Sequence, residues 1–114
     1  MTIKRIDVGP RMSQAVVHGN TVYLAGQVAK GASVGEQTTA ILKGIDDLLS
    51  AAGTDKTKLL SATIWLADMS TFAEMNAVWD RWVSPGNTPG RATVEAKLAV
   101  PDYRVEIAVI CAIS

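Results

Sequence analysis

Pro89–Val94 (PGRATV) and Val105–Ile113 (VEIAVICAI) decide how the rest of this chain can be arranged. Because side chains alternate between the two faces of a strand, the first stretch puts Arg91 and Thr93 on one face. In the second stretch Glu106 heads an otherwise apolar row formed by Ala108, Ile110 and Ala112. A buried carboxylate without a partner is destabilising by several kcal/mol. We therefore expect Glu106 to be paired, hydrogen-bonded or close to water, and Arg91 is the candidate to share its site.

Four further stretches have strand patterns. Ile3–Asp7 predicts the first strand. Ala15–Val17 and Thr21–Leu24 are rich in β-formers and flank Gly19-Asn20, which is a signal for a two-residue hairpin. Leu59–Ala67 predicts a strand with two distinct faces, made of Leu60, Ile64 and Leu66 on one side and Ser61, Thr63 and Trp65 on the other.

Two stretches have helical spacing. Ser33 followed by Glu36 predicts a capping box for a helix that ends at Ala52-Gly53. Thr71 followed by Glu74 predicts a second box, for a helix that ends at Pro85-Gly86. We expect the apolar stripes of both helices to be core, namely Ile41, Ile45, Leu48 and Ala52 in the first and Phe72, Met75, Trp79, Trp82 and Val83 in the second.

The order βββαβαββ predicts an α+β fold, an α/β sandwich, with a single domain over residues 1–114. Each helix has the length of a crossover between parallel strands, and two helices cover one face of a mixed six-stranded sheet. The other face then carries Trp65, Ala108, Ile110 and Ala112, which are too apolar to leave in water. We expect a homo-oligomer that packs sheets on sheets to bury this face, either a closed ring of three or a dimer.

The charge balance argues against nucleic acid as a partner. The net charge is zero and the isoelectric point is near 6.5, so the chain lacks the basic footprint that neutralises phosphates. The N-terminal residues contain no apolar signal region, and no run is long enough to span a bilayer. A cytoplasmic protein with no membrane partner is expected. The charges that we interpret as solvated are Asp46, Asp47, Lys56, Lys58 and Glu95.

The single cysteine and the single histidine offer no metal cluster. Cys111 lies in an apolar run, where a buried small hydrophobe is a better interpretation than a reactive thiol. His18 lies at the tip of the predicted hairpin, where we expect a solvated polar residue.

Several candidate site residues have two interpretations each. Gly26 is either a bulge or turn, which the residues alone favour, or a backbone position that a ligand approaches closely. Asn76 either satisfies a backbone group at the margin of its stripe or pins a loop or a ligand. Arg91 and Glu106 form either a structural salt bridge that fixes the oligomer or part of a site.

A set of short motifs covers nearly the whole chain, from about Gly9 to Ile113. The motifs are Gly9-Pro10 with Ser13–Val16, Gly19–Gln27, Phe72-Ala73 with Met75–Ala77, Arg91–Val94, Pro101 and Val105–Ile107. Together they resemble the Rid family, also called the YjgF or RidA family, and within it the YoaB-like branch.

The resemblance implies a small homotrimer of chorismate-mutase-like fold, with sites in clefts between neighbouring subunits. It also implies a deaminase that hydrolyses reactive 2-imino acids to 2-oxo acids and ammonia, without a metal or an organic cofactor. Arg91 would grip the substrate carboxylate with its two-pronged guanidinium, and Glu106 would hold and deprotonate the attacking water. The N–H of Gly26 or of Thr93 would steady the substrate, and Asn76 would buttress a loop.

The chain departs from the family pattern at three places. Arg11-Met12 stands where an aromatic residue is common, Ala25 replaces the usual Ser before Gly-Gln, and Thr93 replaces the usual Cys. Losing hydroxyl groups removes hydrogen bonds to substrate or water, so the preferred imine is expected to be larger or more apolar, or the rate lower. Two other functions stay open, which are non-catalytic binding of a carboxylate metabolite and a nuclease or translation-inhibitor activity.

Overall fold

The computed structural model describes residues 1–114 and contains six strands and two α-helices in the predicted order. The elements are β1 Ile3–Val8, β2 Ser13–His18, β3 Thr21–Leu24, α1 Val34–Ala51, β4 Leu59–Leu66, α2 Phe72–Trp82, β5 Gly90–Glu95 and β6 Val105–Ala112. Two short 3-10 turns, Lys56–Lys58 and Met69–Thr71, precede β4 and α2. The hairpin at Gly19-Asn20 is confirmed, with Gly19 in the left-handed region at φ 61°.

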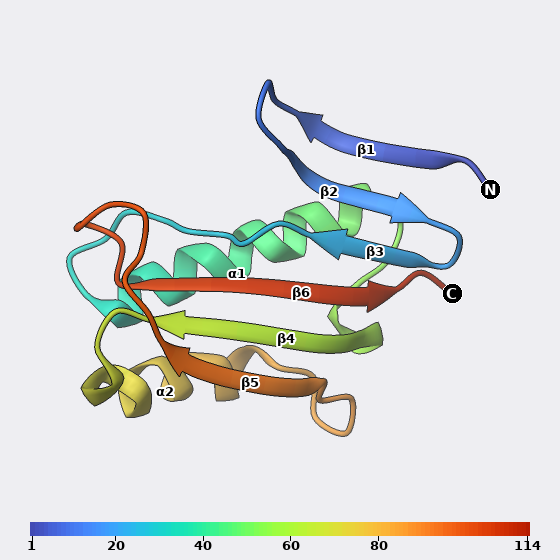
Figure 1. The fold of residues 1–114 in the computed structure, drawn as a ribbon. Coiled ribbons are helices and arrows are strands. Elements are labelled where there is room, and N and C mark those ends of the chain that lie inside the picture. Colours follow the sequence, from blue (N-terminus) through green and yellow to red (C-terminus); the bar gives the residue numbers. More distant parts are fainter.

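All strands form one mixed sheet in the order β1-β2-β3-β6-β4-β5. Only β4 and β5 are parallel neighbours, and β6 lies antiparallel between β3 and β4. Consequently β3 and β4 run in the same direction, and both helices are crossovers between parallel strands, as predicted. Both helices lie on the same side of the sheet (Figure 1). The α+β fold class is confirmed.

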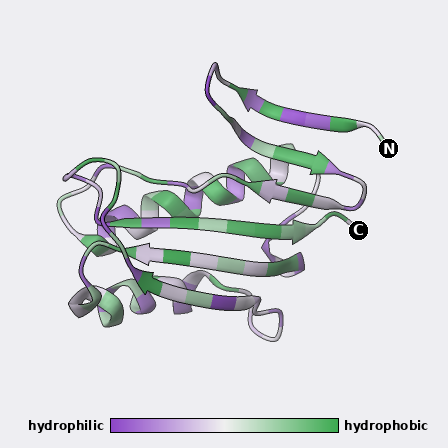
Figure 2. Cartoon of the chain, in the orientation of Figure 1, coloured by the Kyte–Doolittle hydropathy of each residue, from purple (hydrophilic) through white to green (hydrophobic).

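The core lies between this helix-covered face and the two helices. Residues of β6 alternate strictly between buried and half-buried, with Val105, Ile107, Val109 and Cys111 pointing to the helices. The α1 stripe meets them with Ile41 and Ile45, both at most 2% exposed. Figure 2 shows that β6 is apolar along most of its length, which fits a central strand. The interpretation of Cys111 as a buried small residue is confirmed, and burial raises the pKa of its thiol.

The opposite face, which we call the open face, has no covering layer. It carries Trp65 on β4 and, on β6, Glu106, Ala108, Ile110 and Ala112, all half-buried within the sheet's own side chains. Tyr23 on β3 joins this face and is 45% exposed. The molecule is only 19 Å across its shortest axis against 42 Å along its longest, as expected for one sheet with one helical layer. Neither helix combines the length and apolar character needed to cross a membrane.

The cap of α1 is confirmed and the predicted cap of α2 is wrong. Ser33 accepts a hydrogen bond from the N–H of Glu36 at 3.1 Å, and the Glu36 carboxylate accepts one from the N–H of Ala32. Thr71 makes no capping bond through its side chain. Glu74 instead accepts a hydrogen bond from the N–H of Gly35 at 2.8 Å, so it ties α2 to the first turn of α1.

Asp68 caps the turn that leads into α2. Its carboxylate accepts hydrogen bonds from the backbone N–H and the hydroxyl of Ser70, which lower the pKa of this exposed side chain. The side-chain cap therefore belongs to the 3-10 turn that precedes α2 and not to Thr71.

Two predictions are corrected, that Leu60 shares a strand face with Ile64 and Leu66 and that Phe72 belongs to the core. Leu60 is 52% exposed, because the β4–β6 register shifts between Leu59 and Ser61 and Leu59 takes the inward position. Phe72 is 40% exposed at the start of α2 and does not enter the core. Both errors arise where an element begins, because an irregularity there changes which side chain faces inward.

Three charges that we interpreted as solvated make specific contacts. Asp46 accepts a hydrogen bond from the indole N–H of Trp82 at 3.0 Å. Lys56 donates to the carbonyl of Trp82 at 2.6 Å, and its ammonium lies 5.2 Å from the centre of that ring. Glu95 accepts from the N–H of Met69 at 2.9 Å. These contacts join α1 and the turn before β4 to α2, and the end of β5 to the turn that precedes α2.

Candidate active site

Arg91 lies on the edge strand β5, with its side chain on the helix-covered side of the sheet. Its register partner on β4 is Ala62, an inward-facing core residue. The guanidinium carbon lies 5.3 Å from the ring centre of Trp79 and 5.9 Å from that of Phe72, so two aromatic faces of α2 hold the cation. No carboxylate pairs with it, since the one ion pair of the chain is Lys43–Asp47. Arg91 is thus oriented but not neutralised.

Asn76 and Thr93 lie in the same α2–β5 region as Arg91. Thr93 follows Arg91 on the same face of β5, and its register partner is the buried Ile64. Asn76 lies one helical turn after Phe72 and one before Trp79. The side-chain oxygens of Asn76 and Thr93 are buried and have no hydrogen-bond partner. Buried polar atoms normally have partners, so this is the least satisfied polar region in the chain.

Glu106 lies on the open face near the start of β6, opposite Trp65 of β4. Its carboxylate has no ion pair and no hydrogen bond within the chain. A Cβ built on Gly26 would overlap Oε2 of Glu106 and lie 2.8 Å from Cδ. The close approach that Gly26 allows is therefore to a carboxylate of its own chain.

The interpretation of Gly26 as a bulge is confirmed, and its approach by a ligand stays a prediction. Tyr23 pairs with Ile110, and the next bridge to β6 is Gln27 with Ile107. Residues 24–26 therefore lie opposite residues 108–109, which is one extra residue on the β3 side and defines a β-bulge. Gly26 is at the bulge and also provides the space that Glu106 occupies.

The expectation that Arg91 and Glu106 share a site is not met within one chain. The strand β4 separates β5 from β6, and the two side chains point to opposite faces of the sheet. No cross-strand salt bridge joins them. The candidates form two separate groups: Arg91, Thr93 and Asn76 on the helix-covered side, and Glu106 with Gly26 on the open face.

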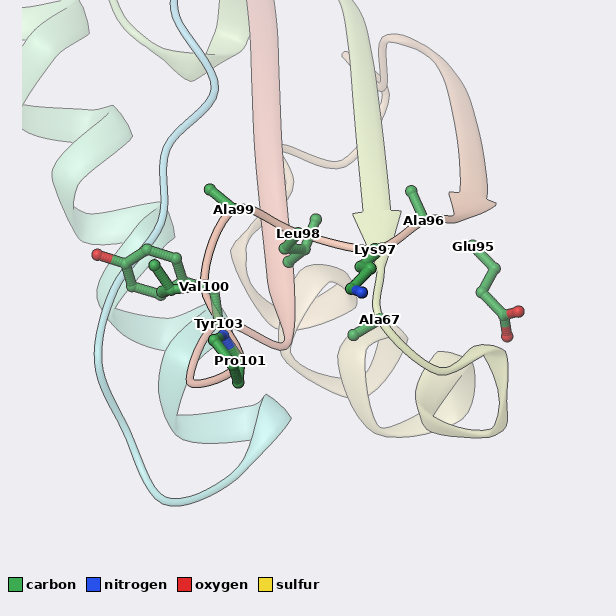
Figure 3. A pocket seen from close by; sticks show the side chains of 9 residues that line it. All are labelled: Ala67, Glu95, Ala96, Lys97, Leu98, Ala99, Val100, Pro101 and Tyr103. Atoms are coloured by element: carbon green, nitrogen blue, oxygen red, sulfur yellow. The ribbon is translucent and has the colours of Figure 1, made fainter.

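The cavities of the single chain lie elsewhere. The largest, about 530 Å³, is enclosed by the β5–β6 loop and lined by Glu95, Lys97, Leu98 and their neighbours, as Figure 3 shows. None of the five cavities is lined by a candidate site residue. A cavity about 200 Å³ in volume opens on the open face beside Tyr23, Thr63 and Ile110. No group of three or more His, Cys, Asp or Glu side chains is placed to hold a metal ion.

Sequence reasoning missed Gln37, which is fully buried on α1. Its Nε2 donates to the carbonyls of Gly31 and Asp102, and its Oε1 accepts from the N–H of Arg104 at 2.9 Å. It therefore joins the loop before α1 to the loop that leads into β6 and Glu106. The available signal was a polar residue one turn before Ile41 on the apolar stripe of α1.

Comparison with known proteins places the chain in a family. Residues 2–113 match the family described as Endoribonuclease L-PSP. The chain is 46% identical over 114 residues to the RutC family protein YoaB of Escherichia coli, covering 99% of this chain and 100% of that protein. It is 32% identical over 106 residues to a 2-iminobutanoate/2-iminopropanoate deaminase of Rattus norvegicus, covering 86% of this chain and 77% of that protein.

A crystal structure of a YjgF protein family member from Neisseria meningitidis has the same fold. It superposes with a TM-score of 0.97 at 45% identity, covering 98% of this chain and 95% of that one. The family match, the full-length sequence relatives and the shared fold all agree with the resemblance seen in the motifs. The chain belongs to the Endoribonuclease L-PSP family, which is the YjgF or Rid family.

Proposed function

We propose that this protein is a deaminase that hydrolyses reactive 2-imino acids to 2-oxo acids and ammonia. The observation that carries the proposal is the pair of unneutralised groups, the Arg91 guanidinium and the Glu106 carboxylate, each held by its surroundings and each without an ionic partner. The rat relative named as a 2-iminobutanoate/2-iminopropanoate deaminase supports this choice of reaction.

Arg91 supplies the grip on the substrate carboxylate. A guanidinium donates two parallel N–H bonds to a carboxylate, which fixes both the position and the orientation of the substrate. Phe72 and Trp79 lie beside the guanidinium through their rings, which offer no competing hydrogen-bond acceptor. The N–H of Thr93 or of Gly26 adds a donor to the bound acid.

Glu106 supplies the proton transfer. It accepts a proton from water as the water oxygen attacks the imine carbon and passes that proton to the nitrogen, which gives a carbinolamine. It then takes the hydroxyl proton of the carbinolamine and passes it to the nitrogen as the carbon–nitrogen bond breaks. One water is consumed, the C=N bond becomes C=O, and ammonia leaves. Because an imine carbon is already electrophilic, positioning and one proton shuttle account for the chemistry.

We further propose that each site combines Arg91 of one copy with Glu106 of another. Two copies that packed their open faces symmetrically would bring both Glu106 side chains inside and leave both Arg91 side chains outside, beside α2. A heterologous contact, with the β5–α2 rim of one copy against the open face of the next, lets the two groups meet. Such contacts close into rings, which favours the homotrimer over the dimer.

Carboxylate binding without turnover is the second candidate. It is favoured by Arg91 alone, since an unpaired guanidinium beside aromatic rings is sufficient to bind the carboxylate of a 2-oxo acid. This alternative predicts saturable binding of pyruvate that Arg91→Ala abolishes, with no consumption of imine. The zero net charge gives an RNA-cleaving function no comparable support.

The deciding experiment generates 2-iminopropanoate and 2-iminobutanoate with an amino-acid oxidase and traps them with semicarbazide. The protein should lower semicarbazone formation, while Arg91→Ala and Glu106→Gln should not. Arg81→Ala, which removes another exposed arginine that lines a separate cavity, should behave like the unaltered protein. Loss of activity in Arg81→Ala, or full activity in Arg91→Ala, would contradict the assigned roles.

A bulkier apolar imine, 2-imino-4-methylpentanoate made from leucine, extends the same assay. The absence of activity on all three imines, combined with pyruvate binding, would establish the binding function in place of the deaminase.

A further inference from the structure

We infer that Gln27, assisted by Gln14, is a positioning residue for Glu106. The inference rests on the proposed catalytic role of Glu106. It assigns a task to a side chain that the proposed mechanism does not use. Three linked observations carry it: the bulge after β3, the hydrogen bonds of the Gln27 amide, and the contact between Gly26 and Glu106.

The bulge leaves the backbone around Gly26 without regular ladder bonds. The residues between the Tyr23–Ile110 pair and the Gln27–Ile107 bridge are out of step with β6 by one position. The N–H of Gly26 donates to no backbone acceptor. The conformation of this segment must therefore be set by other contacts.

Gln27 supplies those contacts, through its backbone toward β6 and through its side chain toward β2. Its backbone N–H donates to Ile107 at 2.8 Å, and its carbonyl accepts from the N–H of Ile107 at 3.1 Å. Its side-chain Nε2 donates to the carbonyl of Ala25 and to Oε1 of Gln14, both at 3.0 Å. The N–H of Ala25 in turn donates to the carbonyl of Gln14 at 2.9 Å. The hydrogen bonds of Gln27 thus fix the backbone of the bulge on both sides of Gly26.

Glu106 lies at this bulge. The carboxylate is against the backbone of Gly26, so closely that a single methyl group there would overlap it. It has no hydrogen bond of its own, and the facing residues Trp65, Gly26 and Ala108 carry no charge. Packing against the bulge therefore sets the position of Glu106. Gln27 holds this bulge from one side and pairs with Ile107, the residue after Glu106, from the other.

A purely structural role for Gln27 predicts something different. The bulge also joins β2 and β3 to β6, so loss of the amide could lower stability alone. In that case turnover of the folded protein would stay unchanged. A positioning role predicts a lower kcat with nearly the same KM, because substrate binding depends on Arg91 while proton transfer depends on the location of Glu106.

The test compares Gln27→Leu, Gln27→Glu and Gln14→Leu in the full-length protein, with Thr21→Val on β3 as a matched control. We expect both Gln27 variants to lower kcat about 10- to 100-fold and to change KM less than about twofold. Gln14→Leu keeps the bond to Ala25 and should have a smaller effect. Gln27→Glu keeps the side-chain shape but loses the donor, so it serves if Gln27→Leu does not fold.

A second measurement is independent of catalysis. The side-chain carboxyl carbon resonance of Glu106 and the amide resonance of Gly26 should shift in both Gln27 variants and remain in place in Thr21→Val. Unchanged resonances, or kcat within about twofold of the unaltered protein, would overturn the inference. If the unaltered protein does not hydrolyse imines, the proposed function fails, and the resonances alone decide whether Gln27 positions Glu106.

Discussion

The two faces of the sheet differ in what covers them, and each carries one half of the proposed site. On the helix-covered face Arg91 rests on two aromatic rings of α2 beside the dry core. On the open face Glu106 lies against a glycine bulge among half-buried apolar residues. Each half is well positioned, and neither finds its opposite charge within the chain. The difference supports the proposal that one copy carries two half-sites and that a contact between copies completes the site.

The largest expected effect comes from mixing two inactive variants. Arg91→Ala and Glu106→Gln each spoil one face and should each lack imine hydrolysis. Unfolded together and refolded in equal amounts, they should recover about a quarter of the unaltered activity, because about a quarter of the contacts in a ring join two intact halves. Mixing the two separately refolded proteins for a short time is the control. No recovery after joint refolding would mean that the halves do not meet across copies.

The open face can be tested by adding a charge to it. Ile110→Asp should dissociate the oligomer and abolish turnover while the single chain stays folded, because Ile110 points away from the helix-covered core. Light scattering after size-exclusion chromatography measures the mass, and circular dichroism reports the fold. The matched control is Ala40→Asp on the exposed side of α1, which should leave the mass unchanged. An unchanged mass for Ile110→Asp would remove the open face as an interface.

The same substitution at two glycines tests the contact at the bulge, because the proposed site requires Gly26 and not Gly44. Gly26→Ala should reduce kcat about 10- to 100-fold, because the new methyl group displaces the Glu106 carboxylate. Gly44→Ala on α1 meets no atom within 4 Å and should raise the free energy of unfolding by about 0.5–1 kcal/mol with activity unchanged. Kinetics and urea denaturation check the pair. Equal activity of both variants would contradict the contact between Gly26 and Glu106.

The smallest expected effect is a change of stability with pH, caused by Cys111 on the helix-covered side of β6. Burial raises the pKa of Cys111, so the folded state resists ionisation of this thiol. The corresponding stability is fully present below the thiol's unfolded pKa, near 9.0, and declines as pH rises toward the folded pKa. Urea denaturation of the unaltered protein and of Cys111→Ala between pH 7 and about 10 should show this decline only in the former.

The accessibility of the same thiol offers a simpler check. At pH 8 a disulfide reagent should modify Cys111 at least about 100-fold more slowly in the folded protein than in urea. A cysteine introduced by Ala40→Cys on exposed α1 should react at the unfolded rate. Rapid modification of Cys111 would show that the helix-covered face is more open than the structure indicates.

The local sequence pattern was sufficient to predict the secondary-structure elements and much of the core. The order of strands and helices, the hairpin, the cap at Ser33 and the α1 stripe were all predicted, because each depends on neighbours within a few positions. Leu60, Phe72 and the Thr71 cap were predicted wrongly, because a register shift and a preceding turn altered the regular repeat. Gln37 and Gln27 were missed, because their partners lie on other elements.

By itself the sequence determined the fold class, the family and the residues of the candidate site, since alternation, helical spacing and motifs are properties of the linear chain. Only the tertiary structure decided which of those residues meet. Alternation shows that Arg91 and Thr93 share a face, but it does not show which face of the sheet that is, because neighbouring strands set it through their register. The insertion of β6 between β3 and β4 separates Glu106 from Arg91, and one extra residue after β3 places Gly26 under the carboxylate. The positions of both Glu106 and Gly26 depend on pairing between strands that are far apart in the sequence.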